Sequence, residues 1–239
     1  MADGVDRILA EQARYYEARA PEYDDVWFRR GPYDLGPEGN ARWFEETAVL
    51  EGALDAFQAT GDVLELACGT GLFTRHLVTT ATSLTAVDAS PAVLDVNRDR
   101  VGDPSVNYVC SDVFEWTPPD GSRFDEIVFT FFISHVPPER FAPFWAHLAT
   151  LLKPGGRVFF ADDLHGAAER PSNPGVQAEE GPDFAHLRTL QDGREYTIVK
   201  LFYTADGIAD ELATLGWSAQ VQSTGQEFIY GTVTPAPAD

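Results

Sequence analysis

Hydrophobic and polar positions repeat with two different periods along the middle of the chain. Between residues 62 and 161, short apolar runs alternate with segments whose apolar residues recur every three or four positions. This alternation is typical of β–α–β units, in which helices join parallel strands. Helices are expected at 91–101 and 138–152, the second ended by the Lys-Pro-Gly-Gly run at 153–156. The apolar runs predict strands at residues 63–67, 83–87, 106–110, 124–131 and 157–161.

The segment before this region predicts two helices separated by an aromatic loop. Residues 5–20 have helical spacing of apolar positions, and Pro21 stops the helix. Residues 41–57 predict a second amphipathic helix. The loop between them resembles a lid in composition, and a surface loop held to the core by its aromatic rings explains it equally well. Its aromatic residues are Tyr23, Trp27, Phe28 and Tyr33.

The last third of the chain begins with a polar, Gly- and Pro-rich stretch at 163–186. An Asp-Gly turn at 191–194 separates two apolar runs and predicts a hairpin. A helix at 205–215 and strands at 217–224 and 226–233 are expected to follow.

Composition narrows the possible partners. The chain has 239 residues, of which 44% are hydrophobic and 23% charged, which suits one large α/β domain. The 17 basic and 38 acidic side chains give a net charge of −21, so the protein is expected to repel nucleic acids and anionic membranes. Cys68 and Cys110 are too few for a disulfide framework, and no run approaches the roughly 18–20 apolar residues of a membrane span. We expect a cytoplasmic protein without an export signal.

A glycine turn follows the first strand of the expected parallel sheet. Residues 63–72 run from an apolar strand through Gly69 and Gly71 into a helix. In a doubly wound fold this turn lies where ligands bind, and small residues let the backbone approach them. Asp88 ends the next strand about 20 positions later, where an acceptor for ribose hydroxyls belongs. A β–α turn that binds nothing is the alternative explanation.

The sequence resembles the class I S-adenosylmethionine-dependent methyltransferases. Five motifs of this family occur in register between residues 63 and 161, with one departure, because Ala67 replaces a usual glycine. The matching residues are Glu65, Gly69 and Gly71, then Asp88-Ala89-Ser90, then Ser111-Asp112-Val113, then Phe124 to Phe129 with Ile133 to Val136 following it, and finally Leu152 to Gly156.

The resemblance implies a doubly wound, seven-stranded, mostly parallel sheet whose last strand runs antiparallel. It implies S-adenosylmethionine as cofactor and S-adenosylhomocysteine as product. We therefore expect one methyltransferase domain over 1–239, comprising a lid at 1–58, a cofactor-binding core at 62–162, a substrate-side insertion at 163–195 and the end of the sheet at 196–233. The expected cofactor contacts are Tyr16, Tyr23, Glu65, Ala67, Gly69, Gly71, Asp88, Ala89, Ser90, Asp112, Val113 and Phe131.

Methyl transfer is an in-line displacement, so the enzyme must align the two reactants, exclude water and accept a proton. His135 follows the fourth strand and is the candidate general base, since an unperturbed imidazole titrates near pH 6.5. Capping of the next segment, or packing under the cofactor, would equally explain His135. Tyr16 and Tyr23 would lie near the methionine carboxylate, or would serve helix and loop packing.

Two further groups of side chains fall in the expected substrate-side segments. Arginines there could hold an anionic substrate, although an arginine more often pairs with a nearby carboxylate. Asp162, Asp163 and His165 could bind a divalent metal, but no matching acidic ligand follows the fourth strand, so no metal is expected. The arginines are Arg29, Arg30, Arg170, Arg188 and Arg194.

The expected acceptor is a small, secondary-metabolite-like molecule methylated on oxygen, nitrogen or carbon, and the protein is expected to be a monomer or homodimer. A non-catalytic module that binds S-adenosylmethionine is the first alternative. An NAD(P)-dependent oxidoreductase is the second, and Thr74 disfavours it because a dinucleotide turn carries a third glycine there. A nucleic-acid methyltransferase would need a basic surface that this acidic chain lacks.

Overall fold

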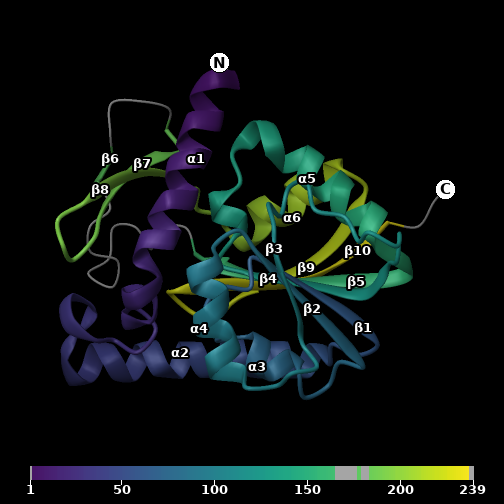
Figure 1. Cartoon of the computed structure of the whole chain (residues 1–239), viewed down its shortest axis with the longest axis horizontal. Helices are drawn as coiled ribbons and strands as arrows, with labels where there is room; N and C mark the ends of the chain where they lie inside the picture. The colour runs from purple at the N-terminus through teal and green to yellow at the C-terminus, as the bar shows by residue number, and fades with distance from the viewer. Residues whose placement is uncertain (1, 165–176, 179–182, 237–239) are drawn as a thin grey trace.

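A seven-stranded sheet forms the centre of the molecule (Figure 1). The computed structural model describes residues 2–164, 177–178 and 183–236. The strand order is β3-β2-β1-β4-β5-β10-β9, and β10 runs antiparallel to both of its neighbours, so the predicted fold class is confirmed. The strands are β1 (Asp62–Leu66), β2 (Ser83–Asp88), β3 (Asn107–Cys110), β4 (Phe124–Thr130), β5 (Leu152–Asp163), β9 (Trp217–Ser223) and β10 (Phe228–Pro235).

Helices cover both faces of this sheet (Figure 1). On one face, α5 (Pro138–Leu151) and α6 (Ala205–Thr214) bury their apolar sides in one hydrophobic cluster. On the other face, α2 (Gly36–Phe57), α3 (Thr74–Leu77) and α4 (Pro91–Val101) contribute to a second cluster. Because both faces are covered, the central strands β1 and β4 are buried along most of their length, and their burial does not alternate from one residue to the next.

Two elements, α2 and β5, begin five residues earlier than the sequence predicts. Helix α2 begins at Gly36, five residues early, because Pro37 lies in its first turn, where a missing amide hydrogen costs nothing. The Lys-Pro-Gly-Gly run at 153–156 was expected to stop the preceding helix, and α5 does end just before it, at Leu151. The run itself belongs to β5, whose pairing with β4 shifts register there.

A second layer lies over the carboxyl ends of the parallel strands. It contains a three-stranded antiparallel sheet of β6 (Gln177–Ala178), β7 (Ala185–Thr189) and β8 (Glu195–Val199), which confirms the hairpin predicted at the Asp-Gly turn. Helix α1 (Ala2–Arg19) lies against this sheet (Figure 1). The expected loop after α1 contains two short 3-10 helices, η1 (Ala20–Asp25) and η2 (Gly31–Tyr33).

Buried polar bonds fix α1 in this second layer. The Gln12 side-chain oxygen accepts the backbone N–H of Val199 at 3.0 Å, and its amide nitrogen donates to the backbone oxygen of His135 at 3.4 Å. His135 lies in the 3-10 helix η3 (Ile133–His135), which follows β4. One side chain of α1 therefore connects the inserted hairpin to the end of a central strand. Among the described residues, no helix is both long and apolar enough to cross a membrane.

Candidate active site

Two adjacent cavities lie where the carboxyl ends of the parallel strands meet the second layer. The larger has a volume of about 470 Å³ and the smaller about 100 Å³. They share one wall, which is built from α1, η1, the turn after β1 and the end of β4. The residues that line both cavities are Tyr16, Tyr23, Ala67, Gly69, Thr130, Phe131 and His135.

The larger cavity collects the residues of the second and third motifs, which the sequence placed far apart. They are Asp88, Ala89, Ser90, Asp112 and Val113. The Asp88 carboxylate accepts the backbone N–H of Gly69 and that of Ser90, each at 3.0 Å. Burial raises the pKa of Asp88, and these amide donors oppose the shift. Asp88 therefore holds two strand-end turns in place and presents its carboxylate to the cavity.

The glycine turn has the left-handed backbone that its motif requires. Ala67, Gly69 and Gly71 have φ angles of 50°, 55° and 86°. A Cβ atom on Gly71 would lie 2.7 Å from the Asn97 side-chain oxygen, so this glycine serves packing against α4 and does not line either cavity. At Ala67 the left-handed conformation costs an alanine roughly 1–2 kcal/mol, which accounts for the glycine usual in the family.

Asn97 supports this turn and was not singled out from the sequence. It is fully buried, and its amide nitrogen donates to the backbone oxygens of Cys68 and Gly69 at 3.3 and 3.0 Å. Its side-chain oxygen accepts the Tyr108 hydroxyl at 2.8 Å. The available signal was a polar residue on the apolar side of the helix at 91–101.

Glu65 lies behind the turn and does not line either cavity. Its side chain is 2% exposed, and burial raises its pKa to about 8. Within the described part of the chain, one of its carboxyl oxygens has no hydrogen-bond partner. With a pKa of about 8 this carboxyl group is mostly protonated at neutral pH, which suits its buried position away from both cavities.

His135 and Tyr16 form a hydrogen-bonded pair on the shared wall. The His135 Nδ1 lies 2.6 Å from the backbone oxygen of Val199, which can only accept, so Nδ1 carries the ring proton. The Nε2 atom therefore accepts the Tyr16 hydroxyl at 2.7 Å. Burial, and then the nearby charge of Lys200, lower the pKa of His135 well below its usual value and keep the ring neutral.

The 3-10 helix η1 is tied to the glycine turn. Thr70 donates its hydroxyl to the Asp24 carboxylate at 2.6 Å, and Arg100 forms an ion pair with the same carboxylate. Arg100 also donates to the Thr70 backbone oxygen at 2.6 Å. The aromatic segment after α1 is thus fixed over the turn by polar bonds as well as by Trp27, which packs on Phe73.

The residues considered for metal binding have another partner. Lys200 is 2% exposed and donates to Ser134 at 2.7 Å and to the Asp163 carboxylate at 2.7 Å. Asp162 is fully buried, 3.5 Å from the same ammonium group. His165 lies outside the described residues. Within the described ranges, no three residues of metal-ligating type come together.

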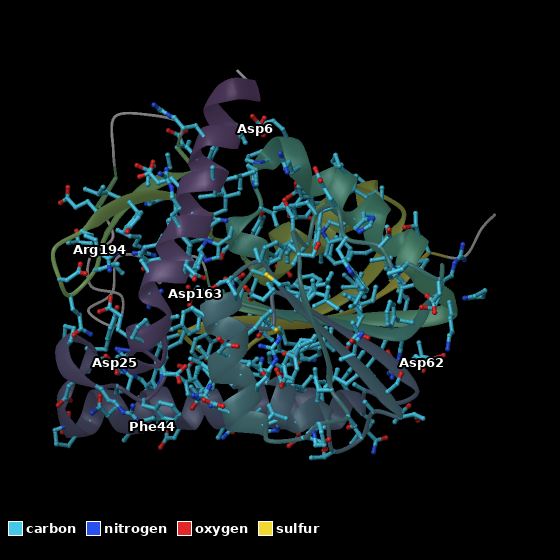
Figure 2. All side chains as sticks on the ribbon, viewed as in Figure 1. Asp6, Asp25, Phe44, Asp62, Asp163 and Arg194 are labelled. Atoms are coloured by element: carbon cyan, nitrogen blue, oxygen red, sulfur yellow. The ribbon has the colours of Figure 1, made fainter. Side chains whose placement is uncertain are left out.

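The candidate substrate-side arginines separate in space. Arg188 lines the smaller cavity, whereas Arg29 lies over the Trp43 ring and donates to the Tyr33 backbone oxygen. Arg194 pairs with Asp192 in the turn of the inserted hairpin, at the outer edge of the molecule (Figure 2). Arg30 is exposed and packs over Phe28, and Arg170 lies outside the described residues. The structure adds two cations that sequence reasoning missed on this wall, Arg19 and Lys200.

Known proteins resemble this chain in sequence and in fold. The family described as a methyltransferase domain matches residues 63–156. A ubiquinone biosynthesis O-methyltransferase of Coxiella burnetii is 35% identical over 102 residues, and a demethylmenaquinone methyltransferase of Clavibacter sepedonicus is 33% identical over 101. These matches cover 41% and 42% of this chain, and 42% and 40% of the relatives. The chain thus spans about two fifths of the length of these curated relatives.

A solved structure extends the similarity over nearly the whole chain. The structure titled DhpI-SAH complex is 33% identical, covers 97% of this chain and 98% of its own, and gives a TM-score of 0.73. A 1,6-didemethyltoxoflavin-N1-methyltransferase of Burkholderia thailandensis shares the fold, with 18% identity, coverage of 97% of this chain and 90% of its own, and a TM-score of 0.59. With the cofactor motifs gathered around one cavity, this chain belongs to the class I S-adenosylmethionine-dependent methyltransferases.

Proposed function

We propose that this chain binds S-adenosylmethionine in the larger cavity and methylates a hydroxyl oxygen of a small molecule held in the smaller cavity. The observation that carries the proposal is the shared wall, where the Tyr16–His135 pair borders both cavities. The Tyr16–His135 pair could accept a proton from a substrate at the wall where two bound molecules would meet. Among the described residues that line both cavities, Tyr16 and His135 are the two whose side chains are hydrogen-bonded to each other.

The cofactor fits the residues present. The larger cavity lies within the range of roughly 300–1,000 Å³ that ligand sites occupy. Asp88 would bind the ribose hydroxyls, Asp112 and Val113 would border the adenine, and Tyr23 the methionine end. When bound, this cofactor supplies an activated methyl group on a positively charged sulfur.

The chain's own residues would remove the proton that a hydroxyl acceptor releases. The acceptor O–H bond breaks as its oxygen gains the methyl group, and the proton moves to the Tyr16 oxygen. Tyr16 passes its own proton to Nε2 of His135, which has a free lone pair directed at that hydroxyl. The positive charge that the donor loses thus reappears on the imidazole, and the total charge of the site is unchanged.

Two of the similar proteins support an oxygen acceptor. The Coxiella burnetii relative is named an O-methyltransferase, as is a malonyl-[acyl-carrier protein] relative from Anoxybacillus flavithermus that is 36% identical over 55 residues. A second structure of DhpI is titled as a complex with SAM and HEP, so that protein holds two ligands in one complex. A complex of that composition supports the proposal that the two cavities of this chain hold two ligands.

Calorimetric titration tests the cofactor. S-Adenosylhomocysteine should bind the wild-type protein and NADH should not, and Asp88→Ala should weaken the sulfur ligand at least tenfold. Asp95→Ala is the matched control, because Asp95 is exposed on α4 and pairs only with Arg98 among the described residues. Circular dichroism checks that both variants fold. Binding of NADH alone, or of neither ligand, would refute the assignment.

Turnover separates an enzyme from a module that only binds the cofactor. The protein should methylate at least one member of a panel of small hydroxy acids, phenols and alcohols. The amount of S-adenosylhomocysteine released measures this turnover. Tight cofactor binding without turnover on any hydroxyl, amine or carbon acceptor would favour the non-catalytic alternative.

A further inference from the structure

The smaller cavity carries an excess of positive charge, although the chain as a whole is strongly acidic. Among the described residues, three cationic side chains line it, Arg19, Arg188 and Lys200, together with two acidic ones, Asp163 and Glu227. The wall therefore reverses the sign of charge that dominates the rest of the molecule.

The two carboxylates of this wall already have partners. Asp163 binds the ammonium group of Lys200 at 2.7 Å. Burial lowers the pKa of Arg29, and the charge of Glu227 opposes that shift, so Glu227 acts on a cation outside the cavity wall. Neither carboxylate of the cavity wall therefore balances the positive charges of Arg19 and Arg188.

Arg188 is the more informative of the two remaining cations. It lies on β7 and is only 9% exposed, yet its guanidinium has no ion pair or side-chain hydrogen bond among the described residues. Arg19, by contrast, lies over the rings of Tyr15 and Tyr23, 5.5 and 5.1 Å from their centres. A buried guanidinium without a counter-charge is costly, and a bound anion would remove that cost.

The position of Arg188 indicates which ligand it meets. Residues of the inserted hairpin do not line the larger cavity in the described part of the chain, whereas Arg188 lines the smaller one. The charge of Arg188 also acts to lower the pKa of His135 and that of Tyr16, so its guanidinium lies near this pair. An anion on Arg188 would therefore belong to the molecule beside the Tyr16–His135 pair and not to the adenosyl part of the cofactor.

We propose that the methyl acceptor carries an acidic group, a carboxylate or a phosphoryl group, and that Arg188 is the residue that selects it. The proposal rests on the function proposed above and names the class of its substrate. The planar guanidinium can donate two parallel hydrogen bonds to either oxyanion, and the second cation, Arg19, adds long-range attraction. A neutral analogue of the same shape would leave Arg188 buried and unpaired.

Direct binding of simple probes tests this inference without knowledge of the natural acceptor. Inorganic phosphate, acetate and the neutral acetamide would be titrated at constant ionic strength into the full-length protein, with and without S-adenosylhomocysteine. Tryptophan fluorescence reports binding, since Trp27 and Trp43 lie in the cavity wall. Comparing the affinities for phosphate and acetate distinguishes a phosphoryl group from a carboxylate. Comparing acetate with the neutral acetamide isolates the effect of charge.

The variants are Arg188→Gln, Arg188→Lys and the matched control Arg194→Gln, which changes an exposed arginine in the turn of the same hairpin that is paired with Asp192. We expect Arg188→Gln to weaken the preferred anion at least tenfold, Arg188→Lys to restore part of the affinity and Arg194→Gln to change nothing. The affinity for S-adenosylhomocysteine should change less than twofold in all three.

Three results would overturn the inference. Equal anion affinity in wild type and Arg188→Gln would remove Arg188 from the site, and absence of saturation by both anions would remove the anionic acceptor. A parallel loss of S-adenosylhomocysteine affinity in Arg188→Gln would instead assign Arg188 to the cofactor carboxylate. If S-adenosylhomocysteine fails to bind the wild type, the proposed function fails, while the anion titration still decides the charge preference of the cavity.

Discussion

At the scale of single residues, the chemistry depends on which ring nitrogen of His135 carries the proton. Because the Val199 carbonyl fixes the proton of His135 on Nδ1, the other nitrogen is available only through the Tyr16 hydroxyl. In the proposed reaction the phenol would therefore meet the substrate, and the histidine would be the final proton acceptor. Sequence reasoning identified both residues and assigned the base to His135, without the relay between them.

Tyr16→Phe should lower kcat by about 100-fold or more, because it interrupts the relay, while leaving the affinity for S-adenosylhomocysteine within a few-fold of the wild type. Steady-state kinetics and calorimetry measure the two quantities. Tyr230→Phe is the control, since its hydroxyl bonds only Gln222 at 3.1 Å among the described residues. A variant with unchanged kcat would show that the phenol carries no proton.

The dependence of kcat on pH should follow the protonation of His135. Burial lowers the pKa of His135, so the imidazole stays neutral and able to accept a proton below pH 6.5, where an ordinary histidine becomes charged. We therefore expect kcat to remain constant from pH 7.5 down to about 6 and to fall only at more acid pH. A midpoint at or above 6.5 in wild-type kcat would contradict this assignment.

Residues could be predicted from sequence where their role is local. The glycine turn and Asp88 belong to motifs that are contiguous in the chain, so their spacing reveals them. Asn97, Arg19 and Lys200 acquire their roles by contact with segments distant in sequence, and no local pattern marks such contacts. Gly71 matched its motif, but the structure assigns it to packing on Asn97.

At the scale of elements, α1 is the part that joins the two cavities to the inserted hairpin. Its buried Gln12 bonds both Val199 and His135, and its Glu11 accepts the N–H of Thr197 at 2.6 Å. These bonds set the position of the histidine relative to β8. Precision at the site thus depends on how α1 docks as well as on the sheet.

Gln12→Ala should loosen this docking, because it leaves the buried amide of Val199 without its acceptor. We expect a loss of about 1–3 kcal/mol in local stability and faster hydrogen exchange at residues 195–199, with exchange in β1 unchanged. Gln220→Ala, at an exposed position of β9, is the control. Unchanged exchange at Val199 would show that α1 does not hold the hairpin.

The order of elements was predictable and some of their limits were not. Short apolar runs predicted the parallel strands, because a strand that is buried on both faces is rich in apolar residues. The early start of α2 and the inclusion of the Lys-Pro-Gly-Gly run in β5 depend on the neighbouring strand and on tertiary packing, which override local turn chemistry.

At the scale of the whole molecule, a net charge of −21 acts against the compact state through self-repulsion. Raising NaCl from 0.05 to 0.5 M should therefore increase the free energy of unfolding, on the order of 1 kcal/mol, as the Debye length shortens. Urea denaturation measures the change. KCl should act equally if screening is the cause, and a decrease in stability with salt would indicate that ion pairs outweigh repulsion.

The docking of α1 on β8 also determines when this protein becomes complete during its synthesis. Gln12 and Val199 are 187 positions apart, so at roughly 5–20 residues per second the helix leaves the ribosome about ten seconds or more before its partner strand exists. Throughout that interval the side of α1 that later contacts β8 lacks that partner. The Tyr16–His135 pair therefore gains its bond to Val199 only after strands β1 to β5 have been synthesised.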